Sequence, residues 1–119
     1  MELGGGVSLV LYDGHELYEA GDFEPLRAAV RASPGPWRIL ASHHPLTRLE
    51  KDRVGRAARE AIAGLDVPVH LHLAGHRHYL ELAHTGTPPF LQAIAGSGSN
   101  VRSLEAPLDG SRLQAERPG

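Results

Sequence analysis

Two groups of histidines carry most of the chemistry that this chain of 119 residues could perform. Four of its eight histidines, His70, His72, His76 and His78, fall within nine positions in the stretch VHLHLAGHRHYLEL (residues 69–82). A pair, His43 and His44, stands earlier, before a proline. Neutral imidazole is the commonest nitrogen ligand for zinc, iron and related ions. Both groups are therefore candidate metal ligands.

The spacing of each group suggests which side chains could share an ion. Residues two apart on extended backbone project to the same side, so His76 and His78 are expected to point together, toward one metal or two adjacent ones. Gly75, just before them, allows close backbone approach. Adjacent residues point to opposite faces, so only one of His43 and His44 should face a given site. The alternative for both groups is that the histidines are exposed polar residues at strand ends and bind no metal.

His70 and His72 favour a structural role. They alternate with Val69, Leu71 and Leu73, so one face of this segment is aliphatic and the other is histidine. We expect the imidazoles on the less buried face, hydrogen-bonded to neighbours.

Two further stretches resemble ligand sites only superficially. Asp13 and His15 form an Asp-x-His pattern, and Asp22 could add a carboxylate. Asp22 is better explained as a helix N-cap, so we favour coincidence for this set. The segment GSGSN (residues 96–100) lacks the Lys-Ser/Thr and the following helix of a P-loop, and it suits the rim of a site better.

The histidine groups are positioned by alternating strands and helices. Apolar runs predict strands at residues 7–14, 37–42 and 67–75, and helical spacing predicts helices within 21–36 and 49–63, the second ending at Gly64. The second half predicts strands only, at 79–84, 90–95 and 100–105, with residues 105–119 as a loose tail. Ligands of such α/β sheets gather at the carboxyl ends of strands, where His43 and His76 both fall.

Composition narrows the class of protein. The chain is 41% hydrophobic and 22% charged, which predicts one globular domain, whole or partial, over residues 1–119. A net charge of −2 gives no reason to expect nucleic acid or an anionic membrane as a partner. The absence of cysteine excludes thiolate metal sites. No signal segment or membrane-length apolar run is visible, so the default location is the cytoplasm.

Three blocks, taken in order, resemble a known family. They are PWRILASHHPL (36–46), LHLAGHRHYLEL (71–82) and FLQAIAGSGSNVR (90–102). They are similar to the C-terminal half of calcineurin-like metallophosphoesterases, especially the purple acid phosphatase-like branch, over residues 7–104. The resemblance implies an α/β (α+β) fold that is half of a four-layer α/β/β/α sandwich, with helices on a mixed sheet.

The resemblance also implies a dinuclear site of iron, zinc or manganese ions. His43 and His76 would bind one metal and His78 the other, whereas His44 falls where the family varies and is not assigned. The implied activity is a phosphatase-type hydrolysis of a phosphate ester by a metal-bound hydroxide. Arg48 or Arg77 could steer the phosphate; no catalytic residue is assigned.

The chain departs from the family in lacking its N-terminal motifs. Asp-x-His, Gly-Asp-x-x-Asp and Gly-Asn-His-Asp/Glu have no counterpart in register, and the only asparagine is Asn100. Two-metal sites need carboxylates to bridge the ions, which three imidazoles do not supply. The partner that completes the site could be a missing N-terminal half or a second copy. The alternatives are a non-catalytic histidine-rich module that binds a metal or a partner, and an inactive fragment with an exposed sheet edge.

Overall fold

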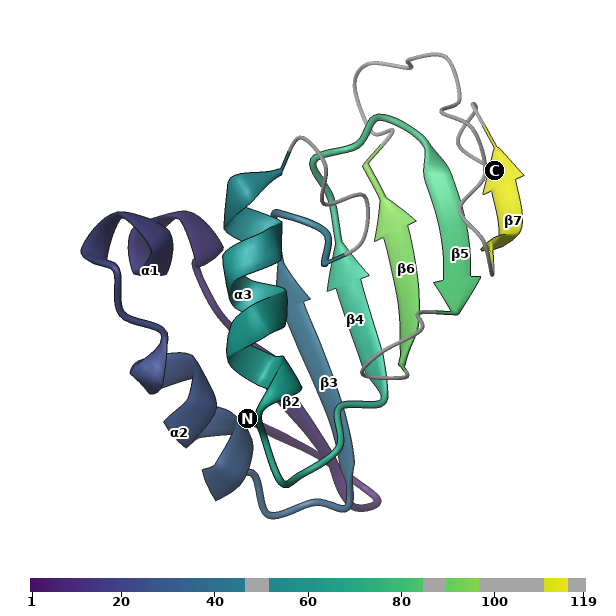
Figure 1. Ribbon diagram of the computed structural model, residues 1–119. Helices are drawn as coiled ribbons and strands as arrows, with labels where there is room; N and C mark the ends of the chain where they lie inside the picture. Colours follow the sequence, from purple (N-terminus) through teal and green to yellow (C-terminus); the bar gives the residue numbers. More distant parts are fainter. Residues whose placement is uncertain (47–51, 85–89, 97–110, 116–119) are drawn as a thin grey trace.

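A computed structural model describes residues 1–46, 52–84 and 90–96, and the backbone of 111–115. Within these residues, three helices lie on one face of a seven-stranded sheet (Figure 1). The fold is therefore mixed α/β, as predicted. In chain order the elements are β1 (Glu2–Gly4), β2 (Val7–Leu11), α1 (Gly14–Ala20), α2 (Glu24–Ala32), β3 (Trp37–Ser42), α3 (Arg53–Ala63), β4 (Leu71–Ala74), β5 (Leu80–His84), β6 (Leu91–Ala95) and β7 (Ser111–Ala115).

The sheet has the strand order β1-β2-β3-β4-β6-β5-β7. Neighbours among β2, β3, β4 and β6 run parallel, whereas β1, β5 and β7 pair antiparallel. β3 and β4 are adjacent, and their last residues, Ser42 and Ala74, are paired. The N–H of Gly75 donates to the carbonyl of His43 (3.1 Å), which extends the pairing beyond both strands. The two histidine groups therefore leave neighbouring strands at one edge of the sheet.

The core lies between the helices and one face of the sheet. Leu40 of β3 is fully buried there, together with Val30 of α2 and Ile62 of α3. The helical spacing that predicted α2 and α3 places Leu26, Val30, Ala58 and Ile62 in this core, whereas Ala29, on the same predicted stripe of α2, is exposed. Of the helices described, the longest, α3, has 11 residues, and none has the length and apolar character that a bilayer span requires.

The short helix α1 was not predicted. The carboxylate of Asp13 accepts from the N–H groups of His15 (2.9 Å) and Glu16 (3.1 Å), and Gly21 ends the helix with φ of 66°. Asp13 is thus used as a helix cap, consistent with reading the Asp-x-His pattern as coincidental. Seven residues without an apolar stripe leave little periodic signal to find.

The helix α2 begins close to the predicted start. The carboxylate of Asp22 accepts from the N–H of Glu24 (2.8 Å), but the N-cap position belongs to Phe23, whose side chain makes no capping bond. The prediction of Asp22 as the N-cap is therefore wrong by one position. Pro25 lies in the first turn, where a missing backbone N–H is tolerated.

The end of the chain differs from the prediction of a loose tail over 105–119. Within it, Ser111–Ala115 form β7, which pairs antiparallel with β5. Without this strand, β5 would present a row of unpaired N–H and C=O groups at the sheet edge, so the pairing is favourable. The strand predicted at 100–105 lies outside the described residues.

The first turn of α3 packs against the turn that holds the histidine pair. A Cβ atom at Gly55 would overlap the carbonyl oxygen of Pro45, so this contact requires glycine. Gly64, at the other end of the same helix, has no atom within 4 Å of its would-be Cβ and has φ of −90°.

We therefore expect Gly55→Ala to lower the free energy of unfolding by about 1–3 kcal/mol, because the helix must move away from the turn. The control Gly64→Ala should change it by less than about 0.5 kcal/mol. Urea denaturation followed by circular dichroism measures both. Equal effects at the two positions would show that the Gly55 contact is not tight.

Candidate metal centre

Three imidazoles converge at the carboxyl ends of β3 and β4. Nε2 of His43 lies 3.0 Å from Nδ1 of His76, and the ring of His44 lies 4.4 Å from that of His76, measured between centroids. One ligand atom from each of the three side chains falls within 4.8 Å of the others. The structure thus brings together His43 and His76, the two predicted ligands of one metal.

His44 also belongs to this group, contrary to the prediction that only one of the adjacent pair would face the site. The prediction was wrong because strand alternation stops at Ser42, where β3 ends. The Ser42 hydroxyl donates to the carbonyl of His44 (2.9 Å), and the chain bends at 43–44 rather than continuing extended. The HHP sequence directly after a strand was the only local signal for this turn.

Asp52 orients His44. Its Oδ2 lies 3.0 Å from Nδ1 of His44, and its Oδ1 accepts from the N–H of Gly55 (2.9 Å) at the start of α3. An ionised carboxylate only accepts, so Nδ1 of His44 carries the proton and Nε2 keeps its lone pair. Carboxylates hold metal-binding histidines in this way in known sites.

The charge of Asp52 suits this role. Burial raises its pKa, but the hydrogen bonds from Gly55 and His44 and the attraction of His44 outweigh burial, so the pKa lies below its usual range. The carboxylate therefore remains ionised at neutral pH, although its side chain is only 3% exposed.

His76 occupies an uncommon backbone conformation. Its φ is 60°, in the left-handed region that few residues other than glycine adopt, and the N–H of Arg77 donates to the carbonyl of Gly75 (2.6 Å). This tight turn is braced from β6, because a Cβ atom at Gly96 would overlap the carbonyl oxygen of Arg77. Gly75 itself would admit a Cβ at ordinary contact distance, so it is not the glycine that the turn needs.

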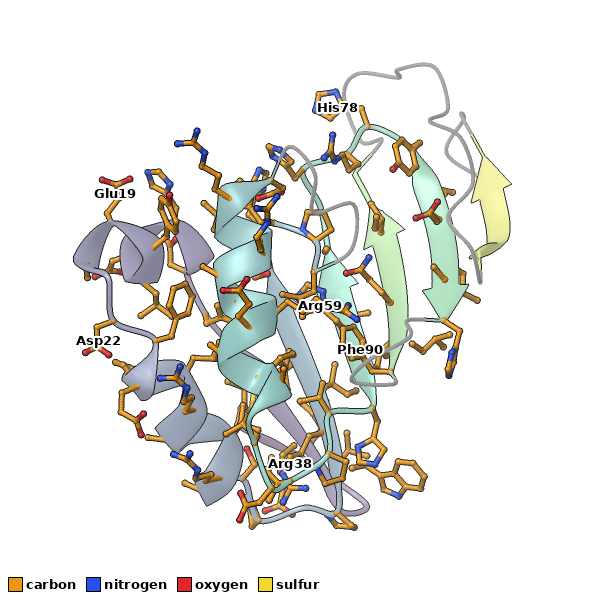
Figure 2. All side chains as sticks on the ribbon, in the orientation of Figure 1. Glu19, Asp22, Arg38, Arg59, His78 and Phe90 are labelled. Carbon is orange, nitrogen blue, oxygen red and sulfur yellow. The ribbon has the colours of Figure 1, made fainter. Side chains whose placement is uncertain are left out.

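His78 does not join the group. The backbone from 76 to 79 bends instead of extending, so the expectation that His76 and His78 project together is wrong. Figure 2 shows His78 at this end of the molecule, projecting away from the sheet. Its Nδ1 is buried without a hydrogen-bond partner among the described residues.

The donor set fits one metal ion. Two nitrogens 3.0 Å apart can both bind an ion at the usual distance of about 2.1 Å. Desolvation lowers the pKa of His76, and the charge of His44 lowers it further, which favours the neutral ring that binds metals. The group found among the described residues contains no carboxylate that could bridge to a second ion, so its donors are those of a single-ion site.

His72 supports the site from within the core. Its Nδ1 lies 3.1 Å from Oε1 of Gln92, which also accepts from the N–H of Leu46 (2.7 Å). Nδ1 must therefore donate, and Nε2 faces the hydroxyls of Ser42 (3.1 Å) and Tyr12 (3.4 Å). This network ties β4 and β6 to both ends of the turn that holds His43 and His44.

His72 has the expected hydrogen-bonded role, but it is not on the less buried face. It has no exposed surface and lies under the helices, whereas aliphatic Leu73 is 40% exposed on the opposite face. His70, just before β4, accepts from the N–H of Arg38 (3.1 Å) through Nδ1, and its ring lies 4.7 Å from that of Trp37 between centroids. Burial lowers the pKa of His72 to about 4.

This shift makes stability depend on pH. Between the unfolded pKa of about 6.5 and the folded pKa, the unfolded chain binds the extra proton, so stability falls as the pH falls. We expect a loss of about 2 kcal/mol between pH 7.5 and pH 5 from this group. The measurement is urea denaturation at both values, comparing wild type with His72→Gln.

His72→Gln should lose the part of the pH dependence of stability that His72 causes. The control His84→Gln, which alters an exposed histidine, should keep it. The assignment fails if His72→Gln retains the wild-type slope.

Comparison with known proteins adds information about the fold. No family model and no curated protein matches the sequence. A solved structure described as GAP50, the anchor in the inner membrane complex of Plasmodium, is similar, with a TM-score of 0.74 at 13% identity. The alignment covers 92% of this chain and 38% of that one, so the chain spans about two-fifths of its length. At this identity the likeness shows a shared fold and no more.

Proposed function

We propose that the chain binds one divalent transition-metal ion through His43, His44 and His76. The observation that carries this proposal is the meeting of three imidazoles from two strand ends, with Asp52 positioned behind one of them. Three protein ligands and an open position are typical of catalytic zinc sites. His43 and His76 are exposed, so water or a substrate could reach an ion held there.

Among the metals expected, the donors favour zinc or iron over manganese. Imidazole nitrogens suit zinc, copper, iron and nickel, whereas manganese prefers oxygen ligands. The group contains nitrogen donors only.

We propose further that the bound ion supports hydrolysis of a phosphate ester. This step rests on the resemblance of residues 36–46 and 71–82 to metallophosphoesterase blocks. An ion at this position would lower the pKa of a coordinated water and offset charge on a phosphoryl oxygen. The chain contributes Asp52, which keeps the tautomer of His44, and the turn at His76, which aims its ring at His43.

A metal-binding module without turnover is the second candidate. It is favoured by the all-imidazole group, since no bridging carboxylate lies with it in the part of the chain described. Zinc uptake without hydrolysis would support this candidate.

Metal binding is tested by titrating zinc into the metal-free chain and following the heat of binding. We expect one ion per chain, and loss of binding in His76→Ala and His44→Ala. Asp52→Asn should weaken binding by about 10- to 100-fold, because the His44 tautomer is no longer held. His78→Ala is the control and should bind as wild type; weakening there equal to that of His44→Ala would contradict the assignment.

Hydrolysis is tested with a chromogenic phosphate ester in the presence of zinc, iron or manganese. We expect metal-dependent turnover that disappears in His76→Ala and persists in His78→Ala. Removal of the metal with a chelator should abolish it, and added zinc should restore it. Activity that survives in a double variant of His43 and His76 would contradict this function.

A further inference from the structure

Across five strands of the sheet, the face opposite the helices is almost entirely apolar. In register across β2, β3, β4, β6 and β5, the side chains that alternate away from the core are aliphatic or aromatic, with one histidine at an end. They are Val7, Leu9, Leu11, Trp37, Ile39, Ala41, Leu71, Leu73, Leu91, Ala93, Ala95, Leu80, Leu82 and His84. We call these residues the open face.

No described helix or strand covers the open face; α1, α2 and α3 all lie on the other side (Figure 1). Leu11 is 64% exposed, Trp37 is 56% exposed and Leu73 is 40% exposed. Contiguous apolar patches larger than a few hundred Å² are rare on monomers and mark interaction sites. The open face is therefore expected to be covered in solution.

We propose that a second copy of this chain covers it, sheet against sheet. The open face carries no formal charge apart from the ionisable His84 at one end, so it is complementary to itself, as an interface with two-fold symmetry requires. Its most exposed members, Leu11, Trp37 and Leu73, lie on three adjacent strands, so the exposed apolar side chains lie on one continuous part of the sheet. The exposed apolar side chains and the absence of formal charge among them both favour a second copy as the occupant.

The resulting dimer has four layers, with helices outside and two sheets inside. Sheets packed in this way lie about 10 Å apart, with side chains from both inner faces interdigitating. The four-layer arrangement that the sequence resemblance implied would then be formed by two chains. The dimer does not rest on metal binding, because the three histidines lie at the edge of the sheet and not on the open face.

The mass of the chain in solution tests this proposal. Sedimentation velocity at micromolar to 100 µM concentration should give twice the 12.8 kDa of one chain. Leu73→Lys and Leu11→Lys should each give the monomer mass with an unchanged circular dichroism spectrum, since either lysine reaches solvent only in the monomer. Ala28→Lys adds the same charge on the exposed side of α2 and should remain a dimer.

Trp37 provides a second measurement, because it is the only tryptophan and lies on the open face. Its emission should be blue-shifted in the dimer, should move to the red on dilution, and should be red at every concentration in Leu73→Lys. A monomeric wild type, a dimer that persists in both lysine variants, or assemblies larger than two would overturn the proposal. A dimer paired through the edge strands β1 or β7 would persist in both lysine variants.

Discussion

The parallel pairing of β3 with β4 is the interaction on which the rest of the structure depends. Because parallel strands end at the same edge, the residues that follow Ser42 and Ala74 emerge side by side. The bond from Gly75 to the His43 carbonyl prolongs the ladder into the two turns. A slip of register by one residue would move His72 to the other face and separate the rings of His43 and His76.

The turns at this edge are held from three directions. Asp52 at the start of α3 reaches His44, and Gly55 lets the same helix approach Pro45. Gly96 of the β6 end lies against the backbone of the GHRH turn (75–78), where His76 has positive φ. Such strain persists only where the surroundings overdetermine it, and it is commonest at functional sites. A positive φ at one of three converging imidazoles fits that pattern.

Local patterns predicted the elements whose residues contact a common core. The strand at 37–42 matches β3 residue for residue, and the stripes that include Val30 and Ile62 mark α2 and α3. The elements that were missed are short or depend on distant partners. β1 has three residues paired to β2, and β7 pairs with β5 across a long interval of chain, so neither is specified by its own periodicity.

The candidate site was predictable in part. His43 and His76 follow from the rule that parallel strand ends converge, which needs only the order of strands and helices. Two orientations were inferred by assuming extended backbone: that only one of His43 and His44 faces the site, and that His76 and His78 point together. That assumption fails because the chain bends after β3 and after β4. His44 joins the group and His78 does not. Asp52 lies eight positions beyond His44, and only the docking of α3 against the turn reveals that the two are in contact.

By itself, the sequence determined the alternation along each strand and the residue types at the strand ends. The tertiary structure decided which face of that alternation is buried. His72 lies under the helices, and Leu73 of the same strand is partly exposed, the reverse of what hydrophobicity indicates. A strand pattern with period two distinguishes its two faces but not their surroundings, because the helices that cover one of them come from elsewhere in the chain.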